Sequence, residues 1–165
     1  MGTPRQRVDV GKSLDAAARH VAERGAQLTP IRRTVLGLLY AERKAVGAYD
    51  LLFKFQQKAG RRAAPNTIYR ALHFLERHRL AAPVAGQRGY VGVLPAHPRR
   101  TVILFTCDQC GGVIERDASR MARVVRLEAR EMGFAILGQP LQVRGSCARC
   151  GTPVTARKRK GARAS

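Results

Sequence analysis

Cys107-Asp-Gln-Cys110 and Cys147-Ala-Arg-Cys150 are two Cys-x-x-Cys motifs, and they contain all four cysteines of the 165-residue sequence. A Cys-x-x-Cys turn presents two thiolates to one metal ion, and a second turn completes a tetrahedral shell of four sulfur ligands at about 2.3 Å. Because four protein ligands leave no open coordination position, such a site stabilises structure and does not catalyse a reaction. The two motifs therefore predict one structural Zn²⁺ that joins two distant parts of the chain.

Three other chemistries use the same residue types. A single Cys-x-x-Cys motif is typical of a thioredoxin-like redox pair, four cysteines can form two disulfides, and four thiolates can also bind an iron–sulfur cluster. Two motifs without a spare cysteine disfavour the redox pair, and no feature of the sequence indicates export. Gly111 and Gly112 after the first motif, and Gly151 after the second, allow the tight turns that a metal site needs. Structural zinc is the preferred interpretation among these alternatives.

The composition is strongly basic. The sequence contains 31 Lys and Arg against 11 Asp and Glu, which gives a net charge of +20. Such an excess predicts a polyanionic partner, most simply a nucleic acid. An Arg-rich proteome from a GC-rich genome would raise the same count, but it would not explain why the basic residues cluster in particular segments.

Other classes of protein are disfavoured. No apolar run approaches the about 20 residues that a membrane-spanning helix needs, and residues 1–6 lack the apolar core of a signal peptide. We therefore expect a cytoplasmic protein without a membrane partner. The sequence also has no paired carboxylates, no nucleophile beside a base and no phosphate-binding loop, so we do not expect an enzyme.

Residues 13–94 are predicted to form a winged helix-turn-helix domain. Apolar residues at helical spacing predict four helices, at residues 13–24, from Pro30 onward, at 48–60 and at 67–79. Strand patterns at 80–85 and 90–94 flank a Gly-Gln-Arg-Gly turn, which predicts a β-hairpin with a basic tip. Helices followed by such a hairpin wing are typical of winged helix-turn-helix proteins.

The fourth helix has the features of a DNA-recognition helix. Asn66 is expected to cap it. Arg70, His73 and Arg77 follow at i, i+3 and i+7, on a face separate from the apolar residues, and Tyr69 lies beside them. An ordinary amphipathic surface helix has the same pattern, but the basic hairpin that follows favours the DNA-binding interpretation.

Residues 101–152 are predicted to form a second, α/β domain, so the fold class of the whole chain is α+β. Its expected elements are strands at 101–107, 113–115, 134–137 and 141–143, and a helix capped by Asp117 that runs to Met132. Residues 95–100 form the predicted hinge, and residues 1–12 and 153–165 are predicted to be disordered tails. A small sheet of this kind has open edges, which dimerisation would cover.

The motifs together resemble the Fur family of bacterial metalloregulators, and most closely its zinc uptake regulator branch. The resemblance covers about residues 14–151 and is specific because the motifs occur in the family's order. They are Leu28-Thr-Pro-Ile-Arg32, Ala48-Tyr-Asp-Leu-Leu52, Thr67-Ile-Tyr-Arg-Ala-Leu72, Phe105-x-Cys-x-x-Cys-Gly-x-Val-x-Glu115 and Cys147-x-x-Cys150.

The resemblance implies a homodimeric, metal-responsive, DNA-binding repressor. It also implies that Cys107, Cys110, Cys147 and Cys150 hold structural zinc, and that Tyr49 and Arg70 contact bases. An arginine at the position of Arg70 can donate two hydrogen bonds to a guanine. The full set of predicted DNA-binding residues is Tyr49, Thr67, Tyr69, Arg70, Arg32, Arg33, Arg77 and Arg88.

One departure from the family concerns its regulatory metal site. The resemblance implies a sensory site at the hinge, with a His from the wing region, a His or Cys after the second wing strand, a His before the Phe-x-Cys motif and a Glu after Gly-x-Val. Of these ligands only Glu115 is present, and His97 lies near in sequence but off the motif. Either zinc sensing has been lost, or a sensor has been rebuilt from residues such as His97, Glu115, Asp117 and Asp108. A zinc-stabilised RNA- or ribosome-associated protein is the alternative function.

Overall fold

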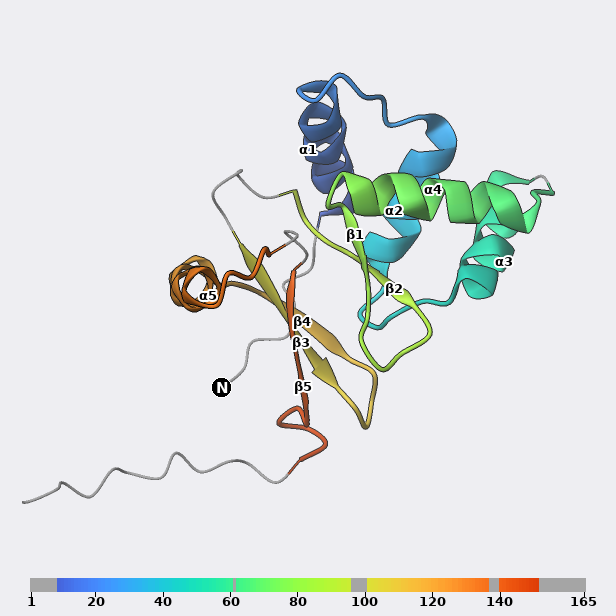
Figure 1. Cartoon of the computed structure of the whole chain (residues 1–165). Helices are drawn as coiled ribbons and strands as arrows, with labels where there is room; N and C mark the ends of the chain where they lie inside the picture. Colours follow the sequence, from blue (N-terminus) through green and yellow to red (C-terminus); the bar gives the residue numbers. More distant parts are fainter. Residues whose placement is uncertain (1–8, 61, 96–100, 137–139, 152–165) are drawn as a thin grey trace, which may run out of the picture.

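A computed structural model describes residues 9–60, 62–95, 101–136 and 140–151 of the chain. Figure 1 shows a helical half, with α1 to α4, beside a half that contains the sheet of β3, β4 and β5 and the helix α5. The two-stranded wing, β1 and β2, lies between them. The predicted α+β class and the winged-helix arrangement are confirmed.

The first three helices follow the predicted order, with one correction at the start. α1 spans Val10–Ala22, and the Asp9 side chain caps it by accepting a hydrogen bond from the backbone N–H of Lys12 at 3.1 Å. The predicted start at Ser13, and with it a tail that extends to residue 12, is therefore wrong, because Asp9 already satisfies the first free N–H groups. α2 is Pro30–Ala41 and α3 is Ala48–Ala59.

α4 spans Pro65–Arg77 and also begins earlier than predicted. Asn66 does not cap it: Ala64 is the capping residue and Pro65 is the first helical residue. Proline suits that position because its φ is already helical and the first N–H of a helix has no acceptor. The buried side of α4 is made by Ile68, Ala71, Leu72 and Leu75.

The helices enclose one apolar core. Its largest fully buried side chains include Phe55, Leu36, Leu39, Leu51 and Leu72, contributed by α2, α3 and α4. Burial of a side chain of this size stabilises the fold by about 1.5–3 kcal/mol. This core fixes the angle between α3 and α4 and so determines which residues of α4 face outward.

The predicted hairpin is present, with shorter strands than expected. β1 is Ala81–Pro83 and β2 is Tyr90–Gly92, paired antiparallel. Val46, in the link between α2 and α3, exchanges two backbone hydrogen bonds of 2.9 Å with Tyr90 and so extends the wing by one bridge. The wing is thereby attached to the helices on one side.

The second half is a three-stranded sheet in the order β4-β3-β5. β3 (Val102–Cys107) pairs antiparallel with β4 (Val113–Asp117) and parallel with β5 (Leu141–Gly145). α5 spans Ser119–Glu131, and its capping residue is Ala118 and not Asp117 as predicted; Asp117 Oδ1 instead accepts hydrogen bonds from the N–H and the hydroxyl of Ser119.

The strand predicted at residues 134–137 is wrong over the part that the structure describes. Residues 134–136 follow the helix terminus at Gly133 and belong to no strand. Phe134 N–H instead donates to the Ala129 carbonyl at 2.7 Å and closes the last turn of the helix. A strand needs a partner along its edge, and β5 already occupies that edge of β3.

A second apolar cluster joins the two halves. Ala82, Val84, Val91 and Val93 of the wing region pack with Val102, Leu104 and Val113 of the sheet. The wing therefore lies directly on one face of the sheet (Figure 1). The predicted hinge, residues 95–100, lies outside the described residues except for Pro95, and the predicted tail 153–165 lies outside them entirely.

Candidate metal centre and nucleic-acid interface

The four cysteines predicted to bind zinc lie together at one end of the sheet. All four Sγ atoms are within 4.8 Å of one another. The Sγ atoms of Cys110 and Cys147 are 3.8 Å apart. In a tetrahedral site with Zn–S bonds of about 2.3 Å, any two sulfurs are separated by about 3.8 Å. The donor set and its spacing therefore fit a four-cysteine Zn²⁺ site.

Short backbone hydrogen bonds shape the two turns. After the first cysteine pair, Gly111 N–H donates to the Cys107 carbonyl at 2.9 Å, and Gly111 has a positive φ of 68° that favours glycine. In the second pair, Gly151 N–H donates to the Cys147 carbonyl at 2.8 Å. A Cβ atom on Gly151 would lie 2.6 Å from the Ser146 Cβ. Both glycines thus meet a steric requirement of the turns.

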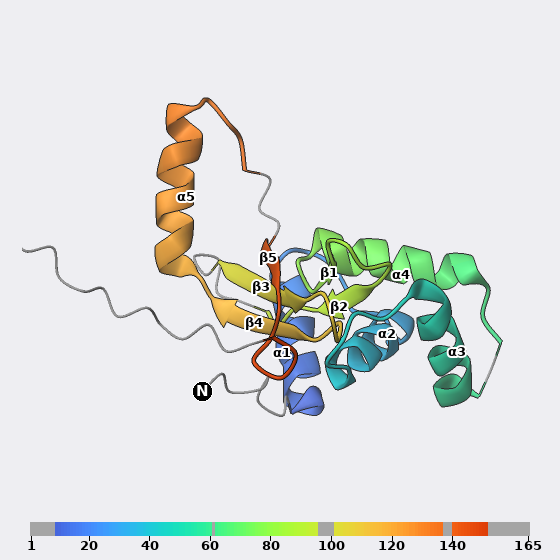
Figure 2. The ribbon, with the colours of Figure 1, turned by 90° about the horizontal axis from the view of Figure 1, so that it is seen from below.

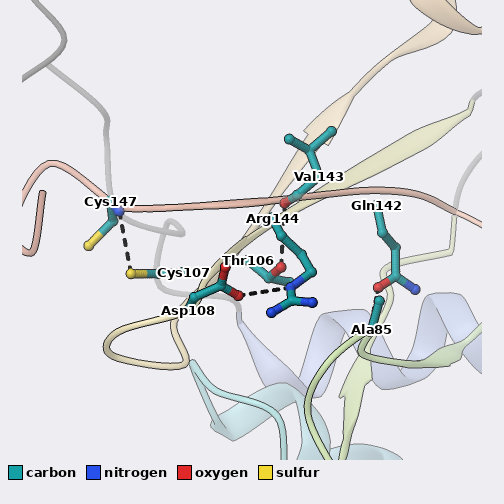
Figure 3. Close-up of polar contacts among 8 residues, drawn as sticks. All are labelled: Ala85, Thr106, Cys107, Asp108, Gln142, Val143, Arg144 and Cys147. Atoms are coloured by element: carbon teal, nitrogen blue, oxygen red, sulfur yellow. Dashed lines mark hydrogen bonds and ion pairs between the residues drawn. The ribbon is translucent and has the colours of Figure 1, made fainter.

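The turns also prepare the sulfurs for a cation. The backbone N–H groups of Cys110 and Cys147 point at the Cys107 sulfur and lower the pKa of that thiol to about 6. Figure 3 shows the contact from the Cys147 N–H, which is 3.4 Å long. The N–H of Arg149 lowers the pKa of the Cys147 thiol. By contrast, the hydrogen bond between Cys150 and Cys147 raises the pKa of the Cys150 thiol to about 12.

These opposed shifts have one physical meaning. N–H donors stabilise the thiolates of Cys107 and Cys147, whereas hydrogen bonds with Cys147 and Cys110 favour the protonated form of Cys150, the fourth ligand. A metal ligand must be deprotonated, and a cation bound among the four sulfurs would supply the positive charge that favours the fourth thiolate. The chemistry of the cluster therefore agrees with its geometry.

The suggested remnants of a sensory site are not brought together in the same way. Within the described residues, the four cysteines are the one group of three or more His, Cys, Asp or Glu side chains close enough to share a metal ion. Glu115 Oε2 accepts a hydrogen bond from Leu94 N–H at 3.4 Å. Asp108 binds Arg144, and His97 lies outside the described residues.

Most of the predicted DNA-binding residues are accessible. Arg70 and Arg77 are exposed on the outer side of α4, and Tyr69 of the same helix is partly exposed. Tyr49 at the start of α3 is 71% exposed, so its ring is accessible to a partner. Thr67 is half-buried, and Arg88 is exposed in the turn of the wing.

Two predicted residues are engaged inside the domain. Arg32 donates to the Gln27 carbonyl at 2.8 Å and lies 3.6 Å above the ring of Phe74. Arg33 forms an ion pair of 2.6 Å with Asp15 of α1. These contacts hold α1, α2 and α4 together, so both arginines have a structural role, and their contact with phosphates stays a prediction.

The residues that the sequence did not indicate lie between the two halves. Gln142 of β5 hydrogen-bonds the wing backbone, and Arg144 of β5 binds Asp108 (Figure 3). Arg144 also lies against Gly86. Gln142 is separated from its wing partners by 57 and 59 positions in sequence. No local periodicity or motif signals a contact of that kind.

A winged-helix domain attached to a sheet with a four-cysteine metal site defines a class of protein, the winged-helix metalloregulators. No family model matches the chain. The chain is 36% identical over 138 residues to the zinc uptake regulation protein of Escherichia coli K12, covering 83% of this chain and 80% of that protein. On this similarity, the chain belongs to the zinc uptake regulators of the Fur family.

Solved structures agree with this assignment. A zinc uptake regulator complexed with zinc and DNA superposes with a TM-score of 0.72 at 33% identity, over 86% of this chain and 95% of that chain. The holo form of XcZur gives a TM-score of 0.68 at 33% identity, over 82% and 94%. These relatives are regulators and not enzymes, as the sequence predicts. Among the described residues, no helix is both long and apolar enough to span a membrane.

Proposed function

We propose that the chain is a transcriptional repressor that binds DNA as a homodimer and holds one structural Zn²⁺ per chain, in the cytoplasm. The observation that carries the proposal is the exposed basic face of α4 in a winged-helix domain. A solved relative of 33% identity is complexed with zinc and DNA, which supports the same ligands here. The relatives give no support to the alternative of an RNA- or ribosome-associated protein.

α4 is the proposed recognition helix, placed in the major groove. Arg70 would read a guanine through two parallel hydrogen bonds, and Tyr49 would contact a second base. Tyr69, Thr67, Arg77 and Arg88 would contact phosphates or sugars, which fix the register of the protein on the duplex. With a net charge of +20, affinity should fall steeply with salt, with a slope of about −0.9 for each phosphate neutralised.

The homodimer is supported by an uncovered apolar surface on the second half. Along β3 the side chains alternate, so that Leu104 faces the wing while Phe105 points to the opposite face and is exposed. Val143 of β5 is exposed as well, and α5 exposes Met121, Val124, Val125, Leu127 and Met132. A patch of this extent is typical of an interface. A twofold dimer would place two α4 helices on a pseudo-palindromic operator.

Arg70→Ala tests the base-reading role. The substitution is expected to lower the preference for a specific duplex over random DNA by about 10- to 100-fold per half-site, because a bidentate Arg–guanine pair is lost. The specific duplex is selected from a random library by the wild-type protein, and both affinities are measured at fixed salt. Arg70→Lys keeps the positive charge but lacks the paired donors of a guanidinium group. This variant should lose the preference for the specific duplex while it retains most of the affinity for random DNA. An equal loss on both duplexes would exclude base reading by Arg70.

We also propose that no second, regulatory zinc is needed. The proposal rests on the ligand set: among the described residues, only the four cysteines form a group of three or more His, Cys, Asp or Glu side chains close enough to share a metal ion. Metal analysis of the pure protein is expected to give one zinc per chain. A mild chelator is expected to leave both this zinc and DNA binding unchanged. A second, weaker zinc whose removal releases DNA would instead show a rebuilt sensor that uses residues such as His97, Glu115, Asp117 or Asp108.

A further inference from the structure

The Gln142 side chain of β5 bridges the sheet and the wing. Its Nε2 donates to the Pro83 carbonyl at 2.8 Å, and its Oε1 accepts from the Ala85 N–H at 2.8 Å (Figure 3 shows the second contact). Both distances are those of well-formed hydrogen bonds. Both the nitrogen and the oxygen of the side-chain amide are thus hydrogen-bonded, to Pro83 at the end of β1 and to Ala85 just after it.

The position of these groups explains why an amide fits. Val84 N–H donates to the Gly89 carbonyl at 3.0 Å, so the backbone groups of residue 84 face the neighbouring strand. The groups of Pro83 and Ala85 therefore point to the outer edge of the hairpin, where no strand within the described part of the chain pairs with them. A Gln amide offers one donor and one acceptor in the spacing of a peptide group. Gln142 does at this edge what a further strand would do.

Arg144 lies two residues along β5, on the same face of the sheet. A Cβ atom on Gly86 would lie 2.6 Å from the Arg144 Cζ, so the guanidinium group rests directly against the turn of the wing. Arg144 Nε also donates to Asp108 Oδ1 at 2.9 Å, and Asp108 is part of the first cysteine turn (Figure 3). Arg144 thereby links the wing turn to the predicted zinc site.

We propose that Gln142 and Arg144 are positioning residues that set the orientation of the winged-helix domain relative to the dimer-forming sheet. The inference rests on the proposed function, DNA binding as a homodimer. Two recognition helices must be held at a fixed separation to bind two half-sites at once. If the wing is docked on the sheet in only a fraction of the molecules, the apparent affinity for the full operator is multiplied by that fraction. Neither residue needs to touch DNA for this effect.

Gln142→Leu removes both hydrogen bonds at nearly constant volume, and Arg144→Ala removes the contact with the wing turn. Each variant is expected to bind the full operator duplex about five- to thirty-fold more weakly, as expected when one or two modest hydrogen bonds are lost. Affinity for a duplex with a single half-site is expected to stay unchanged, because one domain needs no fixed partner. Hydrogen exchange of the Ala85 amide should become faster in Gln142→Leu.

Arg149→Ala is the matched control for charge. Arg149 lies in the second cysteine turn, is exposed, and has no side-chain hydrogen bond or ion pair among the described residues. The Arg149→Ala substitution removes one positive charge from the same segment as Arg144→Ala does. It should therefore change the affinity for full-site and half-site duplexes by the same factor. Zinc content and thermal unfolding are measured for every variant. Should Gln142→Leu lose zinc, the full-site and half-site affinities are measured instead on Gln142→Glu. This variant keeps the acceptor for the Ala85 N–H and loses the donor to the Pro83 carbonyl.

Four results would separate the possibilities. A full-site loss with unchanged half-site binding supports the positioning role. Unchanged full-site binding together with a fast-exchanging Ala85 amide overturns it, and so does an equal loss on full-site and half-site duplexes. If the wild-type protein prefers no duplex over random DNA, the proposed function fails before the positioning role is reached.

Discussion

Cys147→Ser is expected to abolish zinc binding and to unfold the half of the chain that contains β3 to β5. A serine hydroxyl is not a thiolate, and three sulfurs cannot complete the tetrahedral site. Structural zinc contributes about 10–16 kcal/mol in small four-ligand sites, while whole domains are stable by only about 5–15 kcal/mol. The variant should contain no zinc and should lose the protection of β3 and β5 amides in hydrogen exchange. The helical core of α1 to α4 should persist, because it forms a separate apolar cluster.

Cys147 is an informative position because substitution by serine removes its thiolate and keeps its backbone N–H. Its thiolate is a predicted ligand, and its N–H donates to the Cys107 sulfur. Ser146→Ala is the neighbouring control: Ser146 accepts only a long hydrogen bond of 3.5 Å from Gln109, so this variant should keep its zinc. A Cys147→Ser protein that still holds one zinc per chain and keeps a protected sheet would contradict a four-cysteine site.

Local signals in the sequence predicted most of the fold correctly. The Cys-x-x-Cys spacing identified the metal site, and apolar periodicity placed α2, α3 and the buried face of α4. Errors occurred where two local signals competed. Asn66 is a good capping residue, but Pro65 before it already begins the helix. Asp9 caps α1 four residues before Ser13, where the helix was expected to begin, since an aspartate caps as well as a serine.

Contacts between distant elements could not be predicted in the same way. The apolar pattern of residues 134–136 is compatible with a strand, but only the sheet shows that β5 takes that edge. Arg33 looks like a solvent-facing base on α2 until Asp15 of α1 is placed beside it. Gln142 has no distinguishing local pattern, because its role depends on the free edge of a hairpin far away in sequence.

Val124→Asp is expected to break the homodimer and to reduce operator affinity to that of a single half-site. Figures 1 and 2 both show α5 on the far side of the sheet from the helical half, so it packs on little of its own chain. Its buried residues are Ala122 and Ala129. On another side of the helix, Met121 is 54% and Val124 58% exposed. An ionised carboxylate placed in an apolar interface loses its hydration and is strongly disfavoured.

The consequence for DNA binding should be large because two linked sites bind far more tightly than one. Joining two binding domains raises affinity by about 10²–10⁴-fold, and a monomer loses that gain. Arg123→Gln changes the net charge by the same amount at the neighbouring position, about 100° around α5, without adding a carboxylate to the apolar surface, and should leave both the dimer and the operator affinity nearly unchanged. Sedimentation gives the oligomeric state, and metal analysis verifies that zinc is retained. A Val124→Asp protein that sediments as a dimer would place the interface elsewhere, whereas a monomer with full operator affinity would show that dimerisation does not contribute to recognition.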